Sequence, residues 1–343
     1  MMKERSTSSG IVLRVEINPN EATSAIASST DVLDRIADVA SRILAADKAE
    51  NSQRAYESRM RAWGSFCVQH GAQAFPAEPV TVIGWIASMA DAGLSLSTIR
   101  QSVAAMRYAC AMRGEPSPTD DPEVIRAVRG AARLYGRPRR PKKALLLDGL
   151  RKTLPAGRGE RSIQARALLL LGWYSALRRS ELAALRVGDV EVTDEGLVIH
   201  VRRSKTDQSG QGTMRGVPYQ SDSALCPVRA VTRWASTRSA GQAERPEDPF
   251  FRVILRGGRV SDRGIGPKWV ARVVQRTCER AGMSPKDFAG HSLRRGFATE
   301  AARRGKPLEA IQHHLRHASI ATTQRYVEEG KLFDEKNPAT GMA

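Results

Sequence analysis

A short basic segment with two prolines, GRPRRPKK at residues 136–143, divides this 343-residue chain. Proline lacks a backbone N–H and fixes φ, so Pro138 and Pro141 prevent a continuous helix through the segment and stiffen it. Apolar residues recur at helical spacing on both sides of it. We therefore predict two domains joined by a basic linker, which suits a chain too long for one ordinary core.

The part before the linker is predicted to be helical. Residues 1–45 are polar and rich in Ser and Thr, which predicts a poorly ordered arm with one short helix at 31–45. Residues 46–135 carry apolar side chains three or four positions apart, the spacing of one buried helix face. Four helices are expected here: one ending near Gly71, one from Pro79 to Gly93, one capped by Ser97, and one from Asp121 to Tyr135.

The part after the linker, residues 144–343, is predicted to be a larger, mainly helical domain with a C-terminal tail. The apolar run at 165–174 has the length of a buried helix. Residues 197–201 are expected to form a strand, with 214–219 as its partner in a small antiparallel sheet. Further helices are expected at 267–282, 292–304, 307–317 and 322–331. The predicted fold class is mainly α, with two domains and a small β-sheet.

The chain is strongly basic, with 54 Lys and Arg residues against 36 Asp and Glu residues and a formal net charge of +18. Such a balance indicates a polyanionic partner, most often nucleic acid. A membrane surface fits less well, because the sequence has no basic amphipathic helix with an aromatic face. The alternative is a GC-rich genome, which inflates Arg and Ala but would not favour one sign of charge.

Several other classes of protein are disfavoured. No apolar run reaches the roughly 18 residues of a membrane span, and the first ten residues contain no signal-peptide core. The four cysteines lie far apart, so no Cys-x-x-Cys zinc pair exists and a reduced, cytoplasmic setting is expected. The sequence also lacks the Gly-x-x-x-x-Gly-Lys pattern of a nucleotide-binding loop.

Arg178 is the first candidate for chemistry in the larger domain. It directly follows the apolar run, in the motif ALRRSEL at 176–182. An arginine held between rigid flanks suits bidentate binding of a phosphate. An exposed arginine without a special role is the alternative.

Lys205 is the second candidate, because it is the only lysine between Lys152 and Lys268 in a stretch rich in arginine. A lysine can release a proton near neutral pH where neighbouring cations lower its pKa, and an arginine cannot. Lys205 is therefore a candidate proton donor. A solubilising residue at the tip of the predicted hairpin is the alternative.

His291 and Arg294 form a third candidate group, in GHSLRR at 290–295. Three positions apart at the start of a predicted helix, the two side chains should point to one side and offer a proton carrier and a fixed cation. His-x-x-Arg is common by chance, so by itself it favours a structural role.

His317 and Tyr326 complete the set. His313 and His317 are four apart, as in some zinc sites, but no His-Glu-x-x-His pattern and no evident third carboxylate or thiolate ligand accompanies them, so no metal is expected. Tyr326 lies in ATTQRYV at 321–327, a more polar setting than that of an ordinary core tyrosine.

Together these residues resemble the tyrosine recombinase (phage integrase) family. The resemblance rests on ALRRSEL (176–182), HSLRR (291–295) and LRHA (315–318), with Tyr326 nine residues after His317. It covers roughly residues 50–335 and is most similar to Cre-like recombinases in length, linker position and gaps. His317 is the usual residue of the family at its position, where Cre itself has Trp.

The resemblance implies an enzyme that cuts and rejoins DNA through a 3′-phosphotyrosine, without metal, ATP or other cofactor. Tyr326 would be the nucleophile, His291 the acceptor of its proton, and Lys205 the donor of a proton to the leaving 5′-oxygen. The remaining members would surround the phosphate with positive charge and hydrogen bonds or orient the groups that do so. These are Arg178, Arg294, His317 and, as the orienting carboxylate, Glu181.

Recognition of DNA is assigned to the smaller domain and the linker. The helix capped by Ser97 contains TIRQ at 98–101, which resembles a stretch of the DNA-binding domain of Cre-like recombinases. In a major groove Arg100 can read guanine and Gln101 adenine. Phosphate contacts are expected from Arg139 and Arg140 of the linker, and Arg107, which lies further along that helix, would reach a phosphate only if the helix crosses the groove steeply.

The resemblance also implies partners. Strand exchange between two duplexes with inverted-repeat sites proceeds through a Holliday junction and needs four protomers, so a homotetramer on DNA is expected, in the bacterial cytoplasm and at the nucleoid when bound. The apolar Leu332 and Phe333 of the tail are expected to dock into a neighbouring protomer, and a frayed or folded-back tail is the alternative.

Two rival functions share part of this pattern. A type IB topoisomerase-like enzyme would use the same chemistry but relax plasmids that contain no recombination site. A DNA-binding protein that merely kept the fold would have no need of Tyr326.

Overall fold

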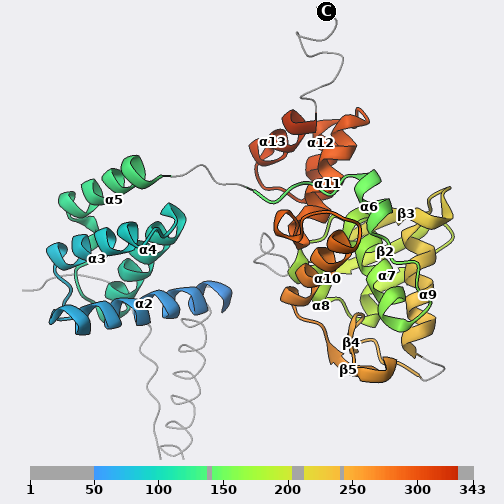
Figure 1. The fold of residues 1–343 in the computed structure, drawn as a ribbon, viewed down its shortest axis with the longest axis horizontal. Coiled ribbons are helices and arrows are strands. Elements are labelled where there is room, and N and C mark those ends of the chain that lie inside the picture. The colour runs from blue at the N-terminus through green and yellow to red at the C-terminus, as the bar shows by residue number, and fades with distance from the viewer. Residues whose placement is uncertain (1–49, 137–140, 203–211, 240–242, 331–343) are drawn as a thin grey trace, which may run out of the picture. The chain divides into compact units, whose positions relative to one another are not determined.

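The computed structural model describes residues 50–136, 141–202, 212–239 and 243–330, and the chain forms two compact units, Met1–Arg139 and Arg140–Ala343 (Figure 1). Both units are mainly helical and the second contains a small antiparallel sheet, as predicted from the sequence. In these ranges no helix is long and apolar enough to cross a membrane. The predicted helix at 31–45, Arg139, Arg140, Lys205, Leu332 and Phe333 lie outside the described residues.

The first unit is built from the four predicted helices. They are α2 (Glu50–His70), α3 (Pro79–Asp91), α4 (Leu96–Arg113) and α5 (Pro122–Tyr135), with the short 3-10 turn η1 (Pro118–Asp120) before α5. Their apolar faces meet in one core, in which Trp63 and Trp85 pack with their ring centroids 5.1 Å apart. Burial of such large aromatic rings contributes strongly to the stability of a small helical unit.

The helix starts in this unit follow side-chain capping, and one differs from the prediction. Asp121 caps α5 as expected, because its carboxylate accepts a hydrogen bond from the N–H of Glu123 at 2.8 Å. The cap of α4 is Ser95 and not Ser97, because the Ser95 hydroxyl accepts from the N–H of Thr98 at 3.2 Å. The helix therefore begins at Leu96.

The second unit consists of a three-stranded antiparallel sheet, a separate two-stranded hairpin and the helices that pack around them. The strands are β1 (Val190–Val192), β2 (Gly196–Val201) and β3 (Thr213–Pro218), in the order β1-β2-β3 with Ile199 opposite Arg215. A separate hairpin pairs β4 (Arg252–Ile254) with β5 (Val260–Gly264). The helices are α6 (Leu147–Thr153), α7 (Glu160–Tyr174), α8 (Arg179–Ala184), α9 (Pro227–Ser239), α10 (Pro267–Arg280), α11 (Gly290–Arg303), α12 (Leu308–Leu315) and α13 (Ile320–Gly330).

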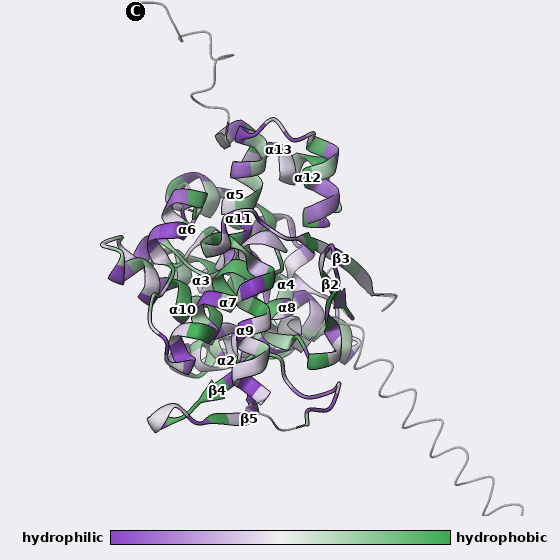
Figure 2. Ribbon diagram, turned by 90° about the vertical axis from the view of Figure 1, so that its right-hand side faces the viewer, coloured by the Kyte–Doolittle hydropathy of each residue, from purple (hydrophilic) through white to green (hydrophobic). Residues whose placement is uncertain are grey.

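Helix α7 is the centre of this unit. All of its residues from Ala167 to Trp173 are buried, as expected from the apolar run in the sequence. Other helices, in contrast, carry both hydrophobic and hydrophilic residues, as Figure 2 shows. The Trp173 indole donates to the carbonyl of Leu145 at 2.8 Å. A Cβ at Gly296 of α11 would lie 1.8 Å from the same carbonyl, so glycine is what allows α11 to approach this closely.

Helices α11, α12 and α13 pack against one another at the C-terminal end of the described chain, drawn in orange and red in Figure 1. Between them lies a small apolar cluster of Ala176, Ala298, Ala302, Ile311 and Leu315. Because most of these side chains are small, the three helices and the turn at residue 176 lie close together. The packing of these helices brings the segment around residue 176 into contact with residues 298–315, which lie more than a hundred positions later in the sequence.

His314 of α12 gives the packing of this region a dependence on pH. Its Nε2 donates to the carbonyl of Tyr174 at 2.9 Å, and its ring stacks on Phe297. Burial and the nearby Arg215 lower the pKa of His314 to about 4. The folded protein therefore holds His314 neutral, whereas in the unfolded chain a histidine titrates near pH 6.5.

As the pH falls below about 6.5, the unfolded chain binds a proton that the folded chain does not. The free energy of unfolding should therefore decrease by up to about 1.4 kcal/mol per pH unit from His314, until its folded pKa is reached. Urea denaturation of the full chain at several pH values measures this. His314→Gln keeps a donor for Tyr174 and should make the decline between about pH 6.5 and 5 shallower by up to about 1.4 kcal/mol per pH unit, while His317, whose pKa is also lowered to about 4, still contributes to it; an equally steep decline would exclude a contribution from His314.

Candidate active site

Six of the predicted catalytic residues meet in the second unit. Arg178 and Glu181 come from the start of α8, and His291 and Arg294 from the first turn of α11. His317 and Tyr326 come from the α12–α13 turn and from α13. Helix packing thus joins segments more than a hundred residues apart in the sequence.

Arg294 is the most deeply buried of these residues, with 2% of its surface exposed. Its Nη1 donates to the carbonyl of Ala176 at 2.7 Å, and its Nη2 donates to the carbonyl of Leu315. A guanidinium has five N–H donors, so Arg294 has further N–H groups besides the two that make these hydrogen bonds. Arg294 therefore ties the turn before α8 to the end of α12.

Both of these turns contain a residue in the left-handed conformation that is not glycine. Ala176 and Arg316 each have φ of 51°, and they are the two non-glycine residues with positive φ in the described ranges. Such a conformation costs a residue with a Cβ roughly 1–2 kcal/mol. At Ala176 it turns the carbonyl toward Arg294, which stabilises the turn in return.

Glu181 connects two further arginines. It is 7% exposed, and its Oε1 and Oε2 accept from the Nη1 and the backbone N–H of Arg178, each at 2.8 Å. Its Oε2 also lies 2.7 Å from Nη2 of Arg316. Glu181 therefore contacts Arg178, one of the basic groups that it was predicted to orient, and it also contacts Arg316.

A buried arginine of the sheet adds to the positive charge. Arg215 of β3 is 6% exposed, and its Nε and Nη2 have no hydrogen-bond partner among the described residues. Burial, followed by the charges of Arg316 and Arg294, lowers the pKa of Arg215 to about 9. Burial and Arg178 likewise lower that of Arg294 to about 10.

With pKa values of about 9 and 10, Arg215 and Arg294 remain protonated at neutral pH. Together with Arg178 and Arg316 they place four positive charges around Glu181, which supplies one negative charge. Concentrated positive charge with spare N–H donors is a binding site for an anion such as a phosphate diester. Arg215 and Arg316 could not be identified as site residues from the sequence, because arginine is frequent throughout the chain.

Tyr326 lies beside a histidine. Its hydroxyl is 3.2 Å from Nε2 of His291, which is exposed. The guanidinium of Arg295 lies 5.9 Å from the centre of the tyrosine ring. The ring packs on the apolar cluster around Ala176, so the polar setting predicted from the neighbouring sequence holds for the hydroxyl and not for the ring.

His317 is oriented by a residue that sequence analysis missed. Its Nδ1 hydrogen bonds with the hydroxyl of the fully buried Thr323 at 2.8 Å. Burial and the cations Arg294 and Arg178 lower the pKa of His317 to about 4, so it is neutral at physiological pH. The bond to Thr323 sets the orientation of the ring and leaves Nε2 for another partner.

The predicted DNA-reading residues of the first unit lie on α4. Arg100 and Gln101 are exposed in its first half. Arg107 donates from Nε to the hydroxyl of Thr119 at 3.1 Å and pairs with Asp120 at 2.5 Å. Exposed ion pairs contribute little to stability, so this one does not prevent Arg107 from meeting a phosphate.

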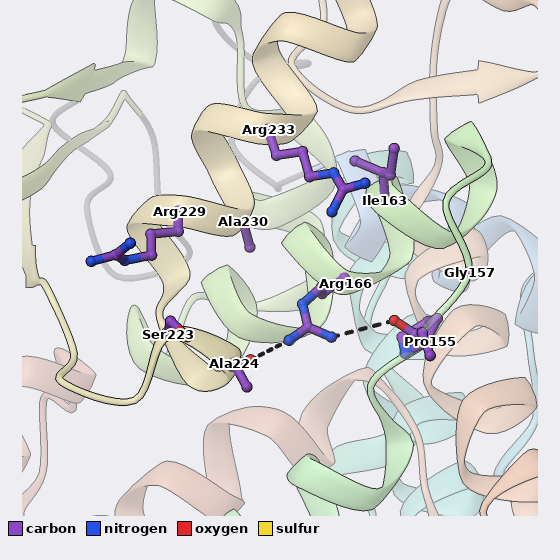
Figure 3. Close-up of a pocket in the computed structure, with 10 residues that line it drawn as sticks. Pro155, Gly157, Ile163, Arg166, Ser223, Ala224, Arg229, Ala230 and Arg233 are labelled. Carbon is purple, nitrogen blue, oxygen red and sulfur yellow. Dashed lines mark hydrogen bonds between the residues drawn. The ribbon is translucent and has the colours of Figure 1, made fainter.

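A separate pocket of about 280 Å³ lies between α7 and α9 (Figure 3). Arg166 crosses it and donates to the carbonyls of Pro155 and Ala224. None of the predicted site residues lines this pocket. Within the described ranges, no group of three or more His, Cys, Asp or Glu side chains is arranged to hold a metal ion.

Comparison with known proteins identifies the family of this chain. Residues 148–331 match the phage integrase family. An integrase/recombinase XerD homolog of Selenomonas ruminantium is 32% identical over 307 residues, 88% of each chain, and the Cre recombinase of Escherichia phage P1 is 26% identical over 298 residues, 81% of this chain and 84% of Cre. The chain therefore belongs to the phage integrase family of tyrosine recombinases, which confirms the resemblance drawn from the motifs.

Solved structures share the fold at low sequence identity. A lambda integrase dimer bound to a COC′ core site matches with a TM-score of 0.56 and 15% identity, covering 93% of this chain and 84% of that one. The Tn1549 transposon integrase in complex with transposon right end DNA matches with a TM-score of 0.55 and 17% identity, covering 83% and 94%. These likenesses confirm the fold.

Glu181 should be needed for both stability and activity. Glu181→Gln leaves Arg178 and Arg316 without their carboxylate, and breaking a buried pair typically costs about 3 kcal/mol. Glu244 is a matched control, because it is also largely buried and pairs with Arg238 and Arg252 in the same unit. Both glutamine variants should lower the unfolding free energy in urea similarly, and Glu181→Gln alone should slow DNA cleavage. Equal cleavage rates would refute the orienting role.

Proposed function

We propose that this chain is a site-specific recombinase that cleaves DNA by transferring a backbone phosphate to Tyr326 and rejoins it by the reverse reaction. The observation that carries the proposal is the placement of the Tyr326 hydroxyl 3.2 Å from His291 in the unit that gathers four arginines around Glu181. A nucleophile, a base and excess positive charge are what attack on an anionic diester requires.

In the cleavage step, the Tyr326 oxygen forms a bond to phosphorus and the bond from phosphorus to the 5′-oxygen breaks. The phenol proton passes to His291, whose Nε2 is within hydrogen-bonding reach. Lys205, which lies outside the described residues, supplies the proton that the leaving 5′-oxygen takes up. The products are a 3′-phosphotyrosine and a free 5′-hydroxyl.

The phosphate gains negative charge on its non-bridging oxygens as the tyrosine attacks. Arg178 and Arg294 stabilise that charge, and Nε2 of the neutral His317 donates a further hydrogen bond. Because the cations are already held in place by Glu181 and by backbone carbonyls, little reorganisation is needed when the charge develops.

No metal ion and no ATP enter the proposed reaction. The energy of the broken diester is retained in the phosphotyrosine, so attack by a 5′-hydroxyl restores the DNA without another energy source. When that hydroxyl comes from a second duplex, strands are exchanged and a Holliday junction forms. Two duplexes with inverted-repeat sites offer four half-sites, which four protomers occupy.

The first unit and the linker are proposed to select the DNA. Helix α4 enters a major groove, where the exposed Arg100 and Gln101 reach base edges. Arg107, Arg139 and Arg140 contact phosphates and contribute affinity without sequence preference. The chain then acts on DNA of the bacterial cytoplasm, consistent with relatives from a bacterium and a bacterial phage.

Tyr326→Phe tests the proposal, because it removes one oxygen atom and retains the ring that packs in the apolar cluster. The variant should bind DNA with unchanged affinity and form no covalent adduct. Because it cannot cleave, it can also select bound duplexes from a random-sequence pool. The selected duplexes are then nicked near the cleavage point, so that the short fragment carrying the 5′-hydroxyl is lost after cleavage and the wild-type chain stays covalently attached to the DNA. Denaturing gel electrophoresis detects this adduct.

An adduct formed by Tyr326→Phe would reject Tyr326 as the nucleophile. Absence of any adduct with the wild-type chain on the selected, nicked duplexes would reject the proposed function itself. Relaxation of plasmids that lack a selected site would favour a topoisomerase-like activity.

Lys205→Ala tests the source of the second proton. The variant should cleave an ordinary selected duplex at least about 100-fold more slowly, the usual contribution of a general acid. A duplex with a 5′-thiol leaving group needs little protonation and should recover most of the rate. Equal defects on the two substrates would remove Lys205 from this role.

A further inference from the structure

Arg316 occupies a position that glycine would fill with less strain. It follows α12 with φ of 51° and ψ of 51°, and the described chain uses glycine at nine other positions with positive φ. A left-handed turn of this kind gains nothing from a Cβ. The presence of arginine therefore indicates that the side chain has a use that the turn itself does not require.

The side chain of Arg316 joins two other segments to this turn. It is 13% exposed, its Nη1 donates to the hydroxyl of Thr213 at 2.7 Å, and its Nη2 lies 2.7 Å from Oε2 of Glu181. Thr213 is the first residue of β3, and Glu181 is the carboxylate that holds Arg178. A planar guanidinium can hydrogen bond to the Thr213 hydroxyl through one nitrogen and form an ion pair with Glu181 through another, whereas lysine has a single ammonium group.

The residue that follows Arg316 is His317, whose ring centre lies 5.9 Å from that of Tyr326. Because Glu181 holds Arg178 and His317 is next to Arg316 in the chain, a movement of this turn relative to Glu181 would also move His317 relative to Arg178. A displacement of about 1 Å between catalytic groups can slow a reaction by about 100-fold. The backbone at Arg316 also closes α12 by donating to the carbonyl of His313 at 3.1 Å.

We propose that Arg316 is a positioning residue, which locks the turn carrying His317 to Glu181 of α8 and to the start of β3. The inference rests on the proposed function, because it concerns the geometry of that reaction. Arg316 acts through Glu181 and through the turn, and it sets the distance between the cation of Arg178 and the groups that follow α12.

Arg316→Gly tests this role while relieving the backbone strain. We expect the variant to remain folded, because relief of backbone strain offsets part of the lost ion pair with Glu181, and its adduct formation is measured at saturating concentrations of the selected duplex. The single-turnover rate of adduct formation on the nicked duplex should fall by about 100-fold. Arg316→Lys should recover the charge but little of the rate, because lysine cannot hold both acceptors.

Thr213 supplies a second test that leaves the backbone at residue 316 unchanged. Thr213→Val removes the acceptor of Arg316 at nearly constant shape and should slow adduct formation by about fivefold. Thr213→Ser restores the hydroxyl and should rescue the rate. In the Arg316→Gly background, Thr213→Val should have no additional effect, since the interaction is already absent.

An adduct rate of Arg316→Gly within about threefold of the wild type overturns the inference. So does a loss of DNA affinity that accounts for the whole defect, and so do equal rates for the Val and Ser variants at position 213. Should Arg316→Gly fail to fold, the two Thr213 variants decide the matter. Adduct formation by the wild-type chain in the same experiment separates these outcomes from a failure of the proposed function.

Discussion

The buried guanidinium of Arg294 is the interaction on which the arrangement of the second unit most depends. It joins the carbonyl of Ala176, before α8, to the carbonyl of Leu315, at the end of α12. A charge that is 2% exposed is tolerable only when strong acceptors surround it, so both turns must present their carbonyls to it. The left-handed conformations at Ala176 and Arg316 lie in these two turns.

The groups of the candidate active site are attached to those same turns. Arg178 follows the first turn, Arg316 lies in the second, and His317 follows it. Glu181 then links the two sides, because it accepts from Arg178 and pairs with Arg316. The result is a set of cations whose positions are determined before any DNA binds, which is the condition for efficient electrostatic stabilisation of a transition state.

This arrangement has an energetic cost that a purely structural core would avoid. Arg215 is buried with two nitrogen atoms that lack partners among the described residues, and its neighbours include three more arginines. Uncompensated buried charge destabilises a fold, and an arriving phosphate would supply the missing negative charge. The partly buried His314 and His317 avoid such a charge by staying neutral, since desolvation and nearby cations lower their pKa values to about 4.

The sequence alone was enough to predict the four helices of the first unit, the buried α7 and the pairing of β2 with β3. Those elements follow from apolar spacing, prolines, glycines and capping residues, which act over a few positions. It did not predict α6, β1 or the β4–β5 hairpin, which are short, or α9, although the buried Val228, Val231 and Trp234 of that helix recur at helical spacing. The cap of α4 was assigned to Ser97 when Ser95 forms the hydrogen bond, because neighbouring serines are equivalent until the backbone geometry is known.

For the site, sequence by itself determined which residue types are available and in what order they occur, from Arg178 to Tyr326, because the motifs are local and family resemblance retains their spacing. Tertiary structure decided the rest. It assigned Arg294 to two backbone carbonyls, packed the Tyr326 ring on an apolar cluster, and brought Thr213, Glu181 and Arg316 together across more than a hundred residues. Such contacts depend on how helices pack, and in a chain with 54 basic residues no local pattern distinguishes the arginine that makes them.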